Sequence, residues 1–305
     1  MRTAFVDELS NIVKQDKNVI LITGDMGYSV FENFQKQFPQ NFINAGISEA
    51  NMVGIAAGLA LAGKKIFLYT FASFDTMRSF EQVRIDLCYQ NLNVNIIGLG
   101  GGITYGKEGS THQALEDIAL MKSLPNMTVL CPGDPIETKA LVSEIIKRNG
   151  PSYIRIGKAG EPIVYNPNQK FAIGKNIKLN QGKDGTIFTT GNMLASAKQL
   201  VSELHQEGLN LNLYQVHTIK PLDKSIINDD LGKFIFTIEE HSEVGGLGSS
   251  IAELLYENRI YLPFFKISLP DAFIKEVGTQ DYLRNIYGLS VSKMKSRILS
   301  QVKNI

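Results

Sequence analysis

The sequence is poor in several residue types, and each shortage excludes a class of protein or of site. It has two cysteines, four histidines, no tryptophan and a net charge of +1. The cysteines, Cys88 and Cys131, lie far apart in apolar surroundings, which predicts buried free thiols in a reducing compartment. The histidines lack the spacing of a zinc site, so we expect no metal site in this chain. With little net charge and no basic run, nucleic acid is not a predicted partner.

Long hydrophobic runs are also missing from the sequence. No apolar stretch approaches the roughly 20 residues that span a bilayer, so no membrane association is predicted. The acids Asp7 and Glu8 stand where a signal peptide would have its apolar core, and we expect a cytoplasmic protein. The 305 residues, 44% hydrophobic and 20% charged, are enough for two globular domains with a core each.

Strand-like and helix-like segments alternate along the chain, which predicts mostly parallel sheets covered by helices. The alternation breaks over residues 157–185, which contain Pro162 and Pro167 and show little periodicity. We interpret this stretch as a connection between domains. The predicted fold is therefore α/β with two doubly wound domains, at residues 1–160 and 185–305, joined by a linker at 161–184.

A helix is predicted over residues 48–63, directly after Gly46 and Ile47. From Met52 to Ala62 it has no charged residue, and its glycines and alanines supply small surfaces. Because a helix that is apolar on all sides lies in the interior, we expect this helix to be buried. Glu49 would then point into a poorly solvated place, where a carboxylate is either paired or moves protons. The alternative is that Glu49 only complements the positive end of the helix.

Ligands of parallel sheets bind at the carboxyl ends of the strands. In the first half of the chain, this rule brings seven residues to one edge: Asp25, Ser29, Glu49, Phe71, Phe74, His112 and Lys158. In the second half it places His217, Glu239, Glu240 and His241 in the same way, but without a companion aromatic cluster. We expect a structural or subunit-contact role for the cluster at 239–241. A long helix is predicted over residues 73–90.

Several short motifs, in this order, resemble the C-terminal half of transketolase. They are Thr23-Gly24-Asp25, Gly46-Ile47-Ser48-Glu49, Thr70-Phe71-Ala72-Ser73-Phe74, Phe80-Glu81-Gln82-Val83-Arg84, Lys107-Glu108-Gly109-Ser110-Thr111-His112-Gln113, Ala114-Leu115-Glu116-Asp117-Ile118-Ala119, Thr218-Ile219-Lys220-Pro221-Leu222-Asp223, Ile238-Glu239-Glu240-His241 and Gly245-Gly246-Leu247-Gly248. The resemblance covers nearly the whole chain and is carried by the order and spacing of the motifs. It implies a pyrimidine-binding domain with a mostly parallel sheet, followed by a transketolase C-terminal domain with a mixed sheet.

The resemblance does not extend to the diphosphate-binding motif of the family. Full-length transketolases carry Gly-Asp-Gly followed later by Asn, whereas this chain has Gly24-Asp25-Met26. The resemblance therefore implies the C-terminal subunit of a split transketolase, which transfers a two-carbon ketol unit between sugars or sugar phosphates. It implies thiamine diphosphate and Mg²⁺ as cofactors, with the Mg²⁺ and diphosphate site on a separate N-terminal subunit. Two copies of each subunit would form an α2β2 heterotetramer.

The resemblance assigns catalytic roles to two residues. Glu49 matches the acid that binds the 1′ nitrogen of the aminopyrimidine ring and so activates the cofactor. His112 matches a histidine that contacts the substrate near its reacting oxygens, and a structural role is the alternative.

The resemblance also implies a set of cofactor-binding residues. Phe74 would stack on the aminopyrimidine, Phe71 and Met77 would line the same pocket, and Asp25 would lie near the thiazolium. The alternatives are ordinary core packing for the three apolar side chains and a helix cap for Asp25.

Substrate recognition is where the sequence departs from the family. Ser29 and Lys158 match positions that bind the substrate phosphate, but the second is usually arginine, whose paired hydrogen bonds lysine cannot make. Glu108 matches a position that is usually aspartate and recognises a sugar hydroxyl. A second family histidine is replaced by the run Gly100-Gly101-Gly102.

Three other functions compete with this interpretation. The beta subunit of a 2-oxo acid dehydrogenase and a relative of deoxyxylulose phosphate synthase use the same cofactor. The stretch Thr111–Asp117 and the pair of Phe71 and Phe74 favour transketolase over both. The third is a regulatory subunit without activity, and the presence of Glu49, Phe74 and His112 argues against it.

Overall fold

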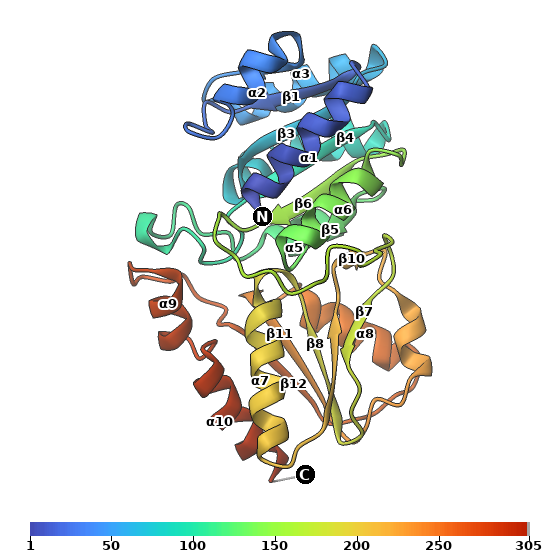
Figure 1. The fold of residues 1–305 in the computed structure, drawn as a ribbon, viewed down its shortest axis with the longest axis vertical. Helices are drawn as coiled ribbons and strands as arrows, with labels where there is room; N and C mark the ends of the chain where they lie inside the picture. The colour runs from blue at the N-terminus through green and yellow to red at the C-terminus, as the bar shows by residue number, and fades with distance from the viewer. Residues whose placement is uncertain (304–305) are drawn as a thin grey trace.

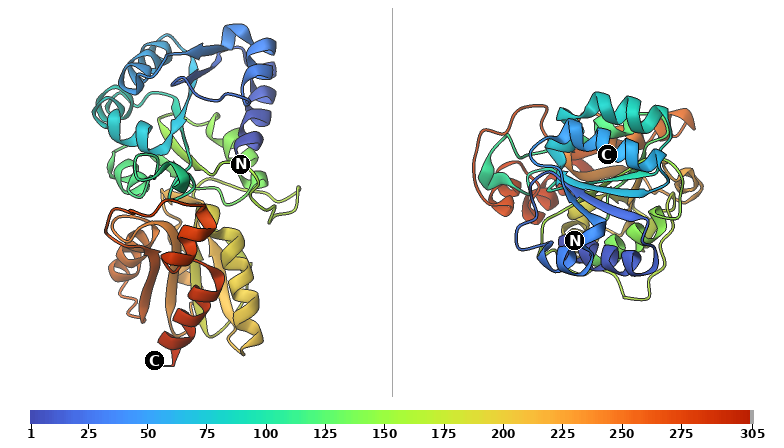
Figure 2. Two further views of the ribbon diagram at one scale, coloured as in Figure 1. Left: turned by 90° about the vertical axis from the view of Figure 1, so that its left-hand side faces the viewer. Right: turned by 90° about the horizontal axis from the view of Figure 1, so that it is seen from above.

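A computed structural model describes residues 1–303 as two α/β lobes stacked end to end (Figure 1). The first lobe, blue to green in Figure 1, contains the N-terminus, and the second, yellow to red, contains the last helices. Helices cover both faces of each sheet, as the two turned views show (Figure 2). The predicted α/β fold with two doubly wound domains is confirmed.

The elements have the following bounds. The strands are β1 (Val19–Thr23), β2 (Phe42–Asn44), β3 (Lys65–Phe71), β4 (Val94–Leu99), β5 (Thr128–Leu130), β6 (Ser152–Ile156), β7 (Ile177–Asn180), β8 (Gly185–Thr189), β9 (Leu211–Gln215), β10 (Thr218–Lys220), β11 (Ile235–Ser242) and β12 (Phe264–Leu269). The α-helices are α1 (Arg2–Gln15), α2 (Glu32–Gln37), α3 (Glu49–Leu61), α4 (Phe80–Gln82), α5 (Asp117–Ser123), α6 (Pro135–Ile145), α7 (Leu194–Gln206), α8 (Leu247–Glu257), α9 (Gln280–Ile286) and α10 (Val291–Val302).

The first sheet has seven strands in the order β10-β5-β6-β4-β3-β1-β2. Its strands are parallel except β10, which runs antiparallel to β5. Every residue of the central strand β4 is buried, because helices cover both faces of a parallel sheet. The edge strand β10 comes from the second half of the chain, so the first sheet is completed by residues that the sequence pattern assigns to the other domain.

The second sheet has five strands in the order β12-β11-β8-β9-β7. The strand β7 runs antiparallel to β9 while the others are parallel, so the sheet is mixed, as the resemblance implies. β7 lies inside the stretch predicted to be a connection between the domains. It is a half-buried edge strand with polar residues, and the sequence of such a strand has little periodicity.

The predicted long helix over residues 73–90 has a different form in the structure. It consists of a π-helix, η2 (Phe74–Arg78), the short α4 and a second π-helix, η3 (Val83–Tyr89). The Thr76 hydroxyl donates to the carbonyl of Ala72 at 2.7 Å, and the Ser79 hydroxyl donates to that of Asp75 at 2.6 Å. Hydroxyls that bond back to carbonyls in this way distort helices, and π-turns are frequent at functional sites.

Helix α3 is less buried than the sequence predicts. Met52 and Ala56 are buried against the sheet, but Gly54, Gly58 and Leu61 are exposed. A Cβ atom on either glycine would meet no described atom within 4 Å, and Leu61 is 65% exposed. The prediction of an interior helix is therefore wrong for the single chain, because one apolar face of α3 is open to solvent.

Two further observations concern the shortages in the sequence. Cys88 and Cys131 are both buried and free, as predicted. Within residues 1–303, no helix combines the length and the apolarity that a bilayer crossing requires.

A buried carboxyl group links α6 to the second sheet. The Glu137 carboxylate accepts hydrogen bonds from the N–H of Gly133 at 2.5 Å and from the side-chain amide of Gln215 in β9 at 3.1 Å. The Tyr165 hydroxyl approaches its other oxygen at 3.4 Å. Burial raises the pKa of Glu137 from 4.5 to about 8, although these hydrogen bonds act in the opposite direction.

We predict that this group makes the stability depend on pH. Since the pKa of Glu137 is higher in the folded chain, the folded chain holds more protons between pH 4.5 and about 8. The free energy of unfolding should therefore fall as the pH rises through this window, by at most about 1.4 kcal/mol per pH unit. Glu137→Gln should flatten this slope in urea unfolding measured from pH 5 to 8, whereas the exposed Glu257→Gln should not. Equal slopes in wild type and Glu137→Gln would contradict the prediction.

Candidate active site

The carboxyl edge of the first sheet gathers most of the predicted site residues. The strands β1, β3, β4 and β6 are parallel and end at this edge. Asp25 follows β1, Phe71 ends β3, His112 lies in the loop after β4, and Lys158 follows β6. Parallel register thus brings together residues that are far apart in the sequence.

Glu49 is the first residue of α3 and is only 4% exposed. Its carboxylate oxygens accept hydrogen bonds from Nη1 of Arg78, at 3.2 and 3.3 Å. The Arg78 side chain of this ion pair is half exposed. The predicted acid is therefore buried and paired with a half-exposed cation.

Three rings form an aromatic cluster beside this ion pair. Phe71 and Phe74 meet edge to face with centroids 5.4 Å apart, and the His112 ring lies 4.8 Å from the first and 5.3 Å from the second. The guanidinium carbon of Arg78 lies 3.8 Å from the centroid of Phe74. Of the two predicted catalytic residues, His112 is therefore part of the cluster, and Glu49 is connected to it through Arg78.

The ring of His112 is held in a defined orientation. Its Nδ1 lies 3.0 Å from the Thr111 hydroxyl, and its ring is half-buried against the two phenylalanines. This hydrogen bond uses Nδ1, so Nε2 is the ring nitrogen that can serve a ligand.

Asp25 lines a cavity of about 440 Å³ together with Phe71, Tyr105 and Arg2. Its backbone N–H donates to the Asn44 side chain at 3.1 Å, and the Asn44 amide donates to the Asp25 carboxylate at 3.0 Å. The next helix begins only at residue 32, so Asp25 does not cap a helix. Its alternative role is therefore excluded.

Ser29 and Met77 face two other cavities. Ser29 is exposed and lines a polar cavity of about 580 Å³, which shares Arg2 with the cavity of Asp25. Met77 and Phe74 line a cavity of about 550 Å³ that also includes Phe273 of the second lobe. The predicted residues therefore lie in neighbouring hollows of one edge and do not share a single cavity.

Lys158 and Glu108 are both exposed at this edge. The Nζ atom of Lys158 lies 5.6 Å from the centroid of Tyr105, and its carbonyl accepts from the N–H of Arg2 at 2.9 Å. This contact keeps two cations, Arg2 and Lys158, at the same part of the edge. Glu108 ends the short 3-10 turn η4 (Gly106–Glu108) in the loop that carries His112.

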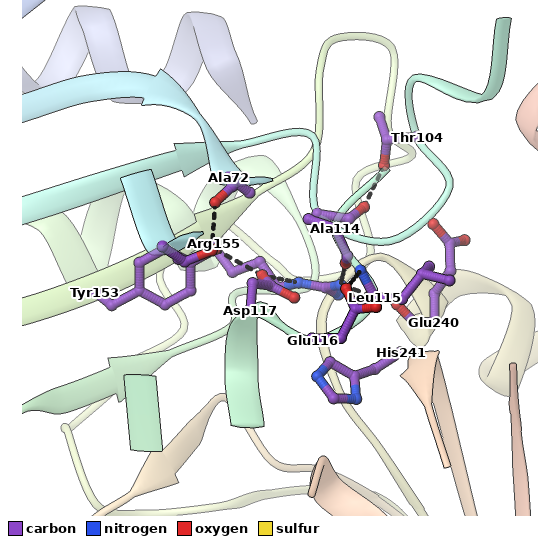
Figure 3. A network of polar contacts seen from close by, with 12 residues as sticks. Ala72, Thr104, Ala114, Leu115, Glu116, Asp117, Tyr153, Arg155, Glu240 and His241 are labelled. Atoms are coloured by element: carbon purple, nitrogen blue, oxygen red, sulfur yellow. Dashed lines mark hydrogen bonds and ion pairs between the residues drawn. The ribbon is translucent and has the colours of Figure 1, made fainter. Parts of the chain in front are cut away.

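A buried ion pair is bonded to the end of that loop, at Ala114 (Figure 3). The Arg155 Nε donates to the Asp117 carboxylate at 2.7 Å, and the Tyr153 hydroxyl donates to the same oxygen at 2.6 Å. The Nη2 of Arg155 donates to the carbonyls of Ala114 at 3.1 Å and Glu240 at 2.9 Å. One guanidinium thus joins β6, the loop after β4 and the second lobe.

The glycine run at residues 100–102 fits this close approach. Gly102 has φ +68°, and a Cβ there would lie 2.6 Å from the Glu240 carbonyl oxygen. A Cβ on Gly101 would lie 2.2 Å from Arg155 Nε. The structure therefore gives a steric reason for the glycines at residues 101 and 102.

The charged cluster of the second half is buried at the contact between the lobes. Glu240 forms an ion pair with Arg284 at 2.6 Å and accepts from the N–H of Ile103 at 3.0 Å. Glu239 accepts from the first N–H groups of α8 at 2.7 Å each, which stabilises the helix start. His217 is also fully buried, and burial lowers its pKa to about 4.

Three residues of this site were missed by the sequence reasoning. Arg2 has no recognisable motif around it. Arg78 stands four residues after Phe74, and this spacing was a usable signal, because it places side chains on the same side of a helix. Asp75 is fully buried, and burial and the nearby Glu49 raise its pKa well above 3.8.

The arrangement suits a flat nitrogen-containing ring. The guanidinium of Arg78 is planar, carries N–H donors in its plane, lies over the ring of Phe74 and donates to Glu49. An aminopyrimidine is also planar, and its ring nitrogen and amino group can hydrogen-bond to a carboxyl group, so Glu49 and Phe74 fit it. Among the described residues, no group of three His, Cys, Asp or Glu side chains is arranged to hold a metal ion.

Known families and proteins match the chain over nearly its full length. The family "Transketolase, pyrimidine binding domain" matches residues 1–160, and "Transketolase, C-terminal domain" matches residues 174–294. An apulose-4-phosphate transketolase subunit of Phocaeicola vulgatus is 37% identical over 99% of this chain and 97% of its own length. A 6-deoxy-6-sulfo-D-fructose transketolase subunit of Clostridium sp. is 36% identical over 96% and 92%.

A solved structure of a transketolase chain also matches this chain over nearly its full length. A chain described as "Split gene transketolase, inactive beta4 tetramer" superposes with a TM-score of 0.88 and 35% identity, covering 98% of this chain and 96% of that one. A 1-deoxy-D-xylulose-5-phosphate synthase of Shouchella clausii is less similar, at 32% identity, and this chain spans 48% of it.

Proposed function

Since this chain belongs to the transketolase family, we propose that it is the C-terminal subunit of a two-chain transketolase. It is part of a thiamine-diphosphate-dependent transferase that moves a two-carbon ketol unit between sugars, and it works with a separate subunit. The observation that carries this function is the match, over nearly the full length of both chains, to one subunit of the apulose-4-phosphate transketolase. The lower similarity to deoxyxylulose phosphate synthases favours ketol transfer over that alternative.

Glu49 and Phe74 hold the aminopyrimidine in this proposal. The carbon chemistry of the reaction is supplied by thiamine diphosphate when it is bound. Glu49 binds the 1′ nitrogen of the ring and holds a proton there, and its burial strengthens this bond. Phe74 stacks on the ring, Phe71 and Met77 close its sides, and Asp25 lies near the thiazolium.

The substrate lies at the cavities along the same edge. His112 offers Nε2 to the reacting oxygens, because its Nδ1 is bonded to Thr111. Arg2 and Lys158 bind an anionic group of the sugar, with Ser29 as a hydroxyl donor, and Glu108 accepts from a sugar hydroxyl. The names of the two relatives support an anionic substrate, since one name specifies a sugar phosphate and the other a sugar with a sulfo group.

The partner subunit supplies the rest of the cofactor site. We place the diphosphate and Mg²⁺ on the N-terminal subunit, because the chain lacks the Gly-Asp-Gly motif. The exposed apolar face of α3 at Gly54, Gly58 and Leu61 supports burial in an assembly, for which we propose an α2β2 heterotetramer. The solved relative, described as a tetramer of beta chains, supports self-association of this subunit as well.

The domain division and the location belong to the same proposal. We assign residues 1–160 to the pyrimidine-binding domain, 161–184 to a linker whose last part contains the edge strand β7 of the second sheet, and 185–305 to the transketolase C-terminal domain. The buried free thiols of Cys88 and Cys131 support a reducing compartment, the cytoplasm.

We predict that the isolated chain is inactive with sugar phosphates, thiamine diphosphate and Mg²⁺. Half of the cofactor site is on the other subunit, so activity should appear only when purified N-terminal subunit is added. Coupled assays of ketol transfer, with each subunit alone and with both, measure this. Robust turnover by the purified chain alone would reject the split-subunit assignment.

Glu49→Gln should lower kcat of the reconstituted complex by at least about 10²-fold, as expected for a lost proton-transfer group. The substitution keeps the shape of the side chain, so the complex should still assemble. Glu253→Gln, an exposed glutamate on α8, is the matched control. Wild-type activity of Glu49→Gln would remove Glu49 from the mechanism.

His112→Ala should impair ketol transfer more than cofactor binding, because His112 faces the substrate side of the aromatic cluster. We expect kcat/KM to fall about 10²-fold while the Kd for thiamine diphosphate changes little. The exposed His205→Ala should leave both values unchanged. A main effect on cofactor affinity would reassign His112 to the cofactor site.

A further inference from the structure

Arg78 makes the two contacts that the proposed function assigns to the cofactor ring. Its Nη1 donates to both carboxylate oxygens of Glu49, at 3.2 and 3.3 Å. Its guanidinium carbon lies 3.8 Å from the ring centroid of Phe74. The Arg78 side chain therefore contacts the carboxylate of Glu49 and one face of the Phe74 ring at the same time.

These contacts cannot be shared with a second planar group. Stacked atoms lie about 3.5–4.0 Å apart, so the guanidinium already fills the first layer over Phe74. A ring that stacks on the same face and bonds to the same carboxylate takes the volume that the guanidinium now fills. Arg78 and the aminopyrimidine therefore compete for one place.

The Arg78 side chain is also able to leave that place. The Arg78 side chain is 50% exposed, whereas the Glu49 side chain that it pairs with is buried. It stands at the end of the π-helix η2 and lines the cavity of about 550 Å³ that extends toward the second lobe. The ion pair thus joins a fixed, buried acid to a cation with open space beside it.

We propose that Arg78 is a positioning residue that stands in for the aminopyrimidine before cofactor loading and is displaced by it. This inference rests on the proposed function, because it takes Glu49 and Phe74 as the cofactor-binding pair. While in place, Arg78 keeps the buried carboxylate of Glu49 paired and oriented, since an unpaired buried charge is strongly destabilising. Its displacement opposes loading and so lowers the affinity for thiamine diphosphate.

The test is a calorimetric titration of the reconstituted two-chain complex with thiamine diphosphate at saturating Mg²⁺. Arg78→Ala removes the competitor, and its Kd should be about tenfold lower than that of wild type. Arg78→Lys keeps the charge but loses the planar stacking, so its Kd should lie between the two. Arg84→Ala, which removes an exposed arginine of the same helical segment, should match wild type.

Thermal unfolding of the same complexes separates this role from a merely structural one. Without thiamine diphosphate, Arg78→Ala should unfold at a lower temperature than wild type, because Glu49 loses its partner. With saturating thiamine diphosphate the difference should disappear. An equal loss in both conditions would indicate a structural role only and overturn the proposal.

The binding measurements distinguish failure of the displacement proposal from failure of the proposed function. If wild-type complex binds thiamine diphosphate but Arg78→Ala binds it equally or more weakly, the displacement proposal is wrong and the proposed function stands. If the wild-type complex does not bind thiamine diphosphate at all, the proposed function fails first.

Discussion

The ion pair of Arg155 and Asp117 is the interaction on which the geometry of this site depends. Both side chains are almost fully buried, and a buried charge is tolerated only when it is paired and hydrogen-bonded. The Nη2 of Arg155 donates to carbonyls of the loop after β4 and of the second lobe. The loop that carries His112 is therefore fixed to the sheet and to the other lobe at once, and the glycines beneath it leave room for this contact.

In the proposed function, the carboxyl edge of the first sheet presents one half of a catalytic centre. The acid Glu49, the aromatic platform of Phe71 and Phe74, and the cations Arg2 and Lys158 lie along this edge, each positioned by a different strand or helix. The remaining half belongs to a separate subunit in the proposed function. A single chain that holds a buried acid and an exposed apolar helix face is consistent with a subunit whose surface is completed by assembly.

Much of this was predictable from the sequence, and the failures have physical causes. Parallel sheets, helix positions and the grouping of Asp25, Glu49 and His112 follow from alternation and from strand ends, which are local patterns. The π-turn at Phe74–Arg78 depends on hydroxyls that bond to the backbone, and no apolar periodicity reports them. The burial of α3 was overestimated, because composition does not reveal which surfaces a partner covers. Arg2 joins the site only through tertiary packing.

The origin of β10 has a consequence for how the two halves can be treated. This short strand belongs to the second half by sequence, yet it pairs with β5 at the border of the first sheet. Cutting the polypeptide near residue 170 would strip β5 of that neighbour and leave its backbone amides and carbonyls free to recruit foreign strands. The two halves of the chain therefore share a sheet. A chimera that combines one half with the other half of a distant relative must keep β10 together with the first sheet.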